Sequence, residues 1–158
     1  IFAWHYLYLG LSLAIMVAFL LILLRLYIAI RPIKNQMPFF YRLWTFHAFV
    51  VYLAWICVAT IANGTALLVG FGWQGEPLSP QVWSMIMIVV ALVLGIFVVG
   101  EQKQPAFGFV LAWAFWGIYS AQSPESKMIG FTAGLSLSFI FSLTVAILVK
   151  SKTKSLPV

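Results

Sequence analysis

Residues 43–70 read LWTFHAFVVYLAWICVATIANGTALLVG, and these 28 consecutive positions contain no Asp, Glu, Lys or Arg. About 20 apolar residues are enough for a helix to cross the roughly 30 Å hydrocarbon layer of a membrane. The stretch therefore predicts a membrane-spanning helix. Four of its residues recur at helical spacing on one face and are called the aromatic stripe below: Tyr52, Trp55, Ala59 and Asn63.

The aromatic stripe combines two aromatic rings, a small residue and one amide. An amide in hydrocarbon costs free energy unless a neighbour hydrogen-bonds it, so Asn63 is expected to face protein rather than lipid. The stripe predicts either a seam between packed helices or one wall of a small cavity. Helix packing is the commoner role of aromatic residues at this spacing.

The string Tyr52-Leu53-Ala54-Trp55, followed by Ala59-Thr60 and Asn63, resembles the last helix of the TspO/MBR family, the tryptophan-rich sensory proteins. Trp4 is similar to the Trp that closes the family's third helix, and the apolar run 7–30 is similar to its fourth. The resemblance covers roughly residues 1–70, and the rest is similar to a longer bacterial branch with additional C-terminal helices.

The resemblance implies a ligand site at the aromatic stripe, because the corresponding helix of the family helps to bind porphyrins, sterols or synthetic aromatic ligands. The sequence departs from the family at three places. Val51 stands where the family often has proline, and residues 64–69 lack the aromatic-plus-Arg ending associated with sterol recognition. The family's first loop and second helix, which supply much of its pocket, match no part of this sequence.

Composition excludes a soluble globular protein. Hydrophobic residues make up 64% of the chain and charged residues 8%, against about 45–50% and 25% in soluble domains. With a mean hydropathy of +1.07, the chain is expected to be an all-α, polytopic transmembrane helical bundle. Its 158 residues leave room for about five spans in one membrane domain. The lone Cys57 excludes an internal disulfide and is expected to fill apolar space.

The chain reads as one transmembrane domain, residues 1–158. Pro32 and Pro38 are expected to end helices in the basic linker 31–42. Residues 106–121 form the shortest predicted segment. The expected spans are 7–30, 43–70, 82–100, 106–121 and 128–149, followed by a basic tail, 150–158.

The basic residues indicate orientation. With five spans, eight of the nine share one side, and only Lys127 lies on the other. By the positive-inside rule, the linker 31–42 and the tail face the cytoplasm, or its equivalent, of a bacterial or organellar membrane. The net charge of +6 is thus explained without nucleic acid, although anionic headgroups would be attracted weakly. The eight are Arg25, Arg31, Lys34, Arg42, Lys103, Lys150, Lys152 and Lys154.

Two histidines could ligate a metal, haem or chlorophyll. His5 and His47 lie near opposite boundaries in this topology, and neither has a Cys, Asp or Glu companion at metal-ligand spacing, so no metal site is predicted. His47 lies farther inside a span and is the better candidate axial ligand for a tetrapyrrole (porphyrin, haem or chlorophyll). The alternative for each is an interfacial hydrogen bond.

Small residues recur every fourth position in the last predicted span. Such a groove lets another backbone approach closely. The partner could be a helix of the same bundle, a second copy of the chain or another subunit. The residues are Gly130, Gly134, Ser138 and Ser142.

No catalytic residue is predicted. The sequence has no Asp, and Glu76, Glu101 and Glu125 all lie in expected linkers. No nucleophile–base pair or carboxylate pair is present, and no acidic residue within a span supports a proton-coupled pump. The chain is therefore expected not to be an enzyme.

The leading hypothesis is a TspO-like membrane sensor, receptor or carrier that binds a tetrapyrrole or another hydrophobic aromatic ligand at the aromatic stripe. The alternative is a non-catalytic structural or accessory subunit of a larger membrane complex, respiratory or photosynthetic. A small transporter comes third. The expected partners are membrane lipid, a hydrophobic small molecule, and either a second copy in a homodimer or the subunits of a larger complex, with no nucleic acid.

Overall fold

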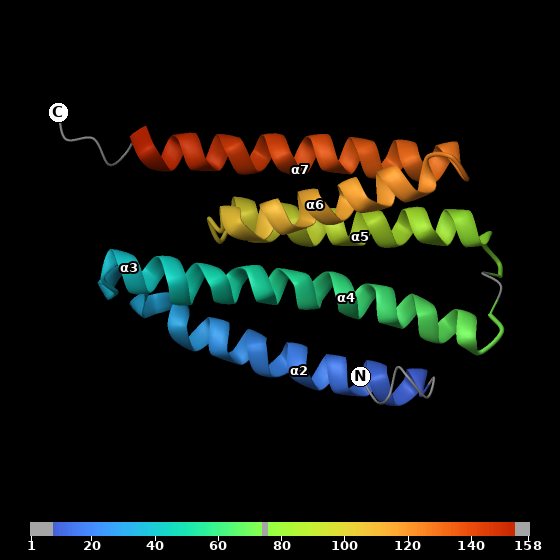
Figure 1. Ribbon diagram of the computed structural model, residues 1–158, viewed down its shortest axis with the longest axis horizontal. Helices are drawn as coiled ribbons and strands as arrows, with labels where there is room; N and C mark the ends of the chain where they lie inside the picture. Colours follow the sequence, from blue (N-terminus) through green and yellow to red (C-terminus); the bar gives the residue numbers. More distant parts are fainter. Residues whose placement is uncertain (1–7, 74–75, 154–158) are drawn as a thin grey trace. The chain divides into compact units, whose positions relative to one another are not determined.

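The structure, a computed structural model, describes residues 8–73 and 76–153, and every regular element in that part is helical (Figure 1). The all-α class is therefore confirmed. By its contacts the chain divides into two compact units, Ile1–Glu76 and Pro77–Val158. The α-helices are α2 (Leu9–Ile30), α3 (Phe39–Tyr41), α4 (Ala48–Gly70), α5 (Pro80–Gly100), α6 (Pro105–Gln122) and α7 (Lys127–Thr153), with a 3-10 helix η1 (Arg31–Gln36) and a π-helix η2 (Arg42–His47).

In the part of the chain that the structure describes, four helical stretches are long and apolar enough to cross a membrane. The helix missing from this set is α6, whose 18 residues would rise about 27 Å. Its Trp113, Trp116 and Tyr119 lower its hydropathy. The sequence analysis expects five spans, and a spanning role for α6 stays a prediction, as does the grouping of all helices in one domain. The four stretches are Leu9–Gln36, Phe39–Gly70, Pro80–Gly100 and Lys127–Ser151.

In the first unit, α2 and α4 form an antiparallel hairpin. The inner face of α2 carries the buried residues Ser12, Leu23 and Tyr27. Leu23 and Tyr27 follow Ser12 by 11 and 15 positions. This spacing returns to one side of a helix. At the end of the hairpin the Tyr27 ring stacks on Phe46, with centroids 6.2 Å apart. The two helices thus pack against each other along this face.

The linker 31–42 is more helical than expected. Pro32 occupies the first turn of η1, where a missing N–H costs no hydrogen bond, so α2 passes directly into η1. The α-helix α2 thus ends at Ile30, just before Arg31 and Pro32, as expected, and the chain continues in a 3-10 helix rather than in an irregular linker. Pro38 does interrupt the helical conformation, because the backbone of Met37 before it is extended (φ −73°, ψ 137°). The next helix then begins at Phe39 and continues through η2 into α4, four residues before the expected start.

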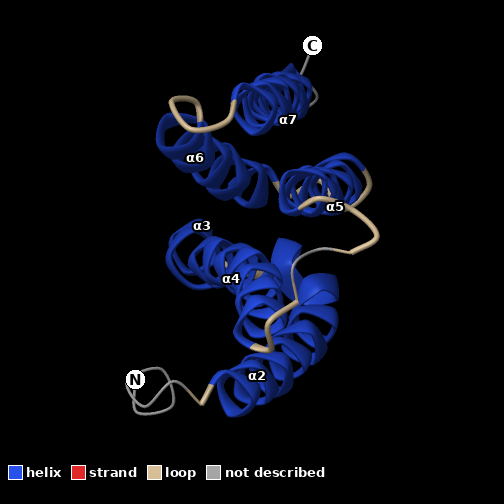
Figure 2. Cartoon of the chain, turned by 90° about the vertical axis from the view of Figure 1, so that its right-hand side faces the viewer, coloured by secondary structure: helices blue, strands red, loops and turns tan. Residues whose placement is uncertain are grey.

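The second unit is a three-helix bundle of α5, α6 and α7, seen close to end-on in Figure 2. The Ser79 hydroxyl accepts a hydrogen bond from the Val82 amide and caps α5. Small residues then bring the helices close together. A Cβ atom placed on Gly95 or Gly108 would collide with side chains of the neighbouring helices. Close approach at small residues is how helices pack where both are surrounded by lipid.

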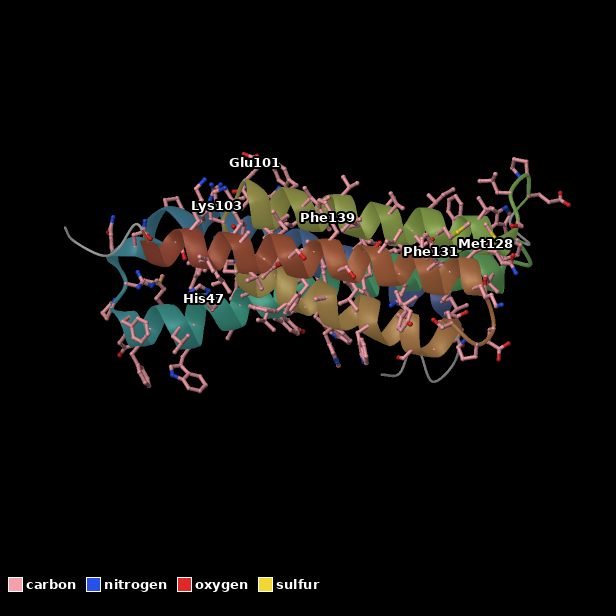
Figure 3. The ribbon with its side chains drawn as sticks, turned by 90° about the horizontal axis from the view of Figure 1, so that it is seen from above. His47, Glu101, Lys103, Met128, Phe131 and Phe139 are labelled. Carbon is pink, nitrogen blue, oxygen red and sulfur yellow. The ribbon has the colours of Figure 1, made fainter. Side chains whose placement is uncertain are left out.

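The turn between α5 and α6 contains Lys103, which adopts the left-handed conformation (φ 53°). Its Nζ donates to the Gly100 carbonyl, and the amide of the buried Gln104 donates to the Gln102 carbonyl at 3.0 Å. Side chains thus satisfy backbone groups that the reversal leaves unpaired. Glu101 and Lys103 lie at this turn, away from Met128 at the start of α7 (Figure 3).

The basic tail begins later than expected. The helix α7 continues to Thr153, so residues 150–153 are helical rather than part of a tail, and positive charge suits a helix C-terminus. Alternating helix directions put Lys103 and Lys150 at one end of the second unit and Lys127 at the other. Which side of a membrane each end faces stays a prediction. Trp4, His5 and Lys154 lie outside the described residues.

Candidate ligand-binding face

The aromatic stripe lies along one side of α4, at the edge of its contact with α2. Tyr52 is 46% exposed and Trp55 is 43% exposed, while Ala59 and Asn63 are half-buried. The buried positions of α4 are different ones: Val50, Leu53, Ala54, Ile56 and Cys57. The first unit therefore leaves both aromatic side chains of the stripe accessible at its surface.

Asn63 has a hydrogen-bond partner on the neighbouring helix. The hydroxyl of the buried Ser12 in α2 donates to Asn63 Oδ1 at 3.4 Å, and Asn63 Nδ2 donates to the Ala59 carbonyl at 3.0 Å. This contact meets the expectation that the amide faces protein. An amide nitrogen carries two hydrogens, and the second has no partner among the residues that the structure describes. One polar donor thus remains on the aromatic side of α4.

Tyr52 also contacts α2, because its ring meets Phe19 edge to face at 5.8 Å and 72°. Neither Ser12 nor Phe19 is among the residues predicted from the sequence. A signal for them was present, since Ser12, Phe19, Leu23 and Tyr27 recur at +7, +11 and +15 on one face of α2. The face was hidden because nearly every other residue of this helix is also apolar.

His47 does not join the aromatic stripe. Five residues separate it from Tyr52, which corresponds to about 140° around a helix. Its ring instead meets Phe46 edge to face at 5.7 Å, and the cations Arg42 and Lys34 act on it electrostatically. Trp55 is eight positions from His47, about 80° around a helix and about 12 Å along it, and the role of His47 as an axial ligand stays a prediction. Within 8–73 and 76–153, no three His, Cys, Asp or Glu residues gather as a metal site would need.

The small residues of α7 separate into two pairs. Gly130 lies against Ser123, and a Cβ on Gly134 would be 3.3 Å from the Tyr119 ring, so both glycines face α6. Ser138 and Ser142 are exposed. Each step of four residues turns about 40° further around a helix, and three steps carry the row off the packed side. The exposed side of α7 also carries Phe131 and Phe139 (Figure 3).

The Ser12–Asn63 hydrogen bond is expected to show a small coupling energy. Combining Ser12→Ala with Asn63→Ala in a double-mutant cycle, measured by unfolding in mixed detergent micelles, should give about 0.6 kcal/mol, the average for such bonds between membrane helices. The 3.4 Å separation argues against a larger value. Thr60→Ala is the matched control, because its hydroxyl bonds only the Ile56 carbonyl of α4. Equal coupling of Ser12 to Thr60 and to Asn63 would contradict the assignment.

The comparison with known families covers more of the chain than the residues that carry the resemblance. Residues 1–147 match the profile of the family described as TSPO-like protein, so the match includes α5, α6 and most of α7 as well as the α2–α4 hairpin. No curated protein and no solved structure matches the chain. Because the family profile covers more than nine-tenths of the sequence and the helices are those of a membrane protein, the chain belongs to the TSPO-like protein family.

Proposed function

We propose that the chain is a TSPO-like membrane sensor or carrier that binds a flat, hydrophobic aromatic molecule, of which a tetrapyrrole is the leading candidate, on the exposed side of the aromatic stripe. One observation carries the proposal. Tyr52 and Trp55 are accessible on the side of α4 that also carries Asn63, whose second amide N–H has no partner among the described residues. Two aromatic surfaces and one polar donor are what an apolar ligand with a single acceptor requires.

Each residue of the aromatic stripe would make one kind of contact with such a ligand. The Trp55 indole would stack on the ring system, Tyr52 would contact its edge, and the second Asn63 N–H would bond a carbonyl or carboxylate oxygen. Ala59 between them leaves room for close approach. His47 lies eight positions before Trp55, about 12 Å along a helix, so the proposal contains no axial ligand to a metal within the ring. It also contains no catalytic group, because the proposed role is binding.

The test is saturable binding of protoporphyrin to the purified chain, followed by the ligand's own absorption as well as by quenching of tryptophan fluorescence. Trp55→Ala should weaken binding about tenfold, equivalent to about 1.4 kcal/mol, and Trp55→Phe should weaken it less. Asn63→Leu should weaken it about fivefold, for the loss of one hydrogen bond. Reading the ligand's absorption keeps the loss of a fluorophore separate from the loss of affinity.

Trp113→Ala is the matched control, since Trp113 is 63% exposed and belongs to α6 in the other unit. It should leave the affinity unchanged. Uptake that never saturates, or that falls equally in the Trp113 and Trp55 variants, would show partitioning into detergent and would refute binding at the stripe.

The native size of the particle distinguishes this proposal from a role as a complex subunit. A sensor or carrier should migrate as one or two copies in mild detergent, and an absorption spectrum of that peak would reveal a bound tetrapyrrole. Migration with a much larger assembly would favour the accessory-subunit hypothesis, with the exposed side of α7 as a contact surface. We also propose that the basic ends of the helices face the cytoplasmic or equivalent side of the membrane, following the positive-inside rule.

A further inference from the structure

The end of the α2–α4 hairpin carries three cations on two short helical segments that contact each other. Arg31 and Lys34 belong to η1, and Arg42 begins η2. The positive charges of Arg31 and Arg42 both act on the Lys34 ammonium, and η1 contacts η2. Like charges at short range repel, more strongly where water is partly excluded. Lys34 is half-buried, so this arrangement raises the free energy of the folded unit unless an anion joins it.

Lys34 is held in place by an aromatic platform. Its Nζ lies 5.7 Å from the centroid of the Phe46 ring, within the range of a cation–π interaction. Phe46 is 1% exposed and stacks on the buried Tyr27. The ammonium is therefore positioned by a rigid part of the fold, unlike a lysine on a mobile surface. A cation held in place on a segment that also carries Arg31, and in contact with the segment that begins at Arg42, is suited to binding an anion.

The described part of the first unit supplies no anion beside these cations. Glu76 is the only acidic residue in the first 76 positions, and it follows the opposite end of α4 from Arg42. The three cations therefore need a counter-ion from outside the first unit.

The position of the cations indicates where that anion comes from. The apolar helix α2 has 22 residues, enough to cross the hydrocarbon layer, so η1 lies at headgroup depth. Four exposed aromatic residues accompany the cations, as in the aromatic belt at a membrane boundary. They are Phe39, Phe40, Tyr41 and Trp44. Phosphate groups of lipids occupy this depth, and the net negative charge of an anionic lipid suits a site that carries three cations.

We propose that Arg31, Lys34 and Arg42 form a binding site for the phosphate of an anionic phospholipid. The Lys34 ammonium bonds the phosphate from its place on the Phe46 ring, and the two guanidinium groups approach from either side. The acyl chains would lie along the apolar exterior of α2, whose exposed residues include Leu24 and Ile28. This site is separate from the aromatic stripe and does not depend on the proposed ligand.

The experiment compares phosphatidylglycerol with phosphatidylcholine of identical acyl chains, counting lipids retained on the full chain by native mass spectrometry from detergent. The first phosphatidylglycerol should bind about tenfold more tightly than phosphatidylcholine. Lys34→Gln and Arg42→Gln should each reduce that preference about fivefold, which corresponds to about 1 kcal/mol per cation near a membrane surface. Arg31→Gln tests the site with an exposed residue whose replacement leaves the packing intact.

Lys127→Gln is the matched control, since Lys127 is an exposed cation in the other unit, and it should leave the preference unchanged. Equal binding of the two lipids, or an equal loss in the Lys127 variant, would overturn the proposal. A further arm of the experiment repeats the measurement in the presence of millimolar inorganic phosphate. If it abolishes the preference for phosphatidylglycerol, the site takes free phosphate, and the assignment to a lipid is wrong.

Discussion

Replacing Phe46 by alanine is expected to lower the free energy of unfolding by about 3–5 kcal/mol, the usual cost of removing a fully buried aromatic ring. Phe46 has 1% of its surface exposed, and it contacts Tyr27 of α2, the ammonium of Lys34 and the ring of His47. The substitution would leave a cavity where α2 meets the start of α4. Unfolding in mixed detergent micelles, followed by circular dichroism, measures the effect.

Phe40→Ala is the matched control for this prediction. Phe40 is the same residue type only six positions earlier, but 67% of its surface is exposed. Its loss should change the free energy of unfolding by less than about 0.5 kcal/mol. Equal destabilisation by the two substitutions would show that Phe46 does not hold the hairpin together. Because Lys34 rests on Phe46, Phe46→Ala should also weaken the proposed lipid site.

The second large effect is expected at Gly108 in α6. A Cβ atom there would lie 2.9 Å from a methyl group of Val99 in α5 and would collide with the Thr144 hydroxyl of α7. Thr144 is fully buried, and its hydroxyl already donates to the Ile140 carbonyl at 2.6 Å, so it cannot turn away without losing that bond. Gly108→Ala should therefore destabilise the second unit by about 1–3 kcal/mol, as overpacking does.

The same helix provides the control. A Cβ on Gly117 would meet no atom within 4 Å, so Gly117→Ala should leave stability unchanged or raise it by up to about 1 kcal/mol through helix propensity. The two variants have the same composition, and thermal unfolding of both in one detergent gives the difference directly. A Gly108 variant as stable as the Gly117 variant would mean that α5, α6 and α7 do not pack this closely.

Helices and their approximate limits follow from local chemistry, which is why the sequence predicted them. Charge-free runs long enough to cross a bilayer must satisfy their backbone groups internally, and a helix does so. The prolines required more than local information. Pro32 and Pro38 look alike in sequence, but Pro32 falls in the first turn of η1 and is accommodated, while Pro38 interrupts the chain. Only the position of the surrounding helix turns distinguishes them.

The sequence by itself determined that this chain is an all-helical membrane protein of the TSPO-like family, because hydrophobic length and the spacing of a few residues in α4 suffice for both. It also placed Tyr52, Trp55, Ala59 and Asn63 on one side of a helix, since that requires only the helical repeat. Those four residues could therefore be identified without knowing which helix they contact.

Only the tertiary structure decided what this side of α4 contacts. Ser12 and Phe19 lie 51 and 33 positions away from Asn63 and Tyr52, and no local rule connects residues at that separation. The same holds for Lys34, which becomes a fixed cation only because the chain folds it over Phe46. In an apolar chain most positions of each helix could pack equally well, so hydrophobicity alone does not select the packed face. The close approach of specific side chains selects it.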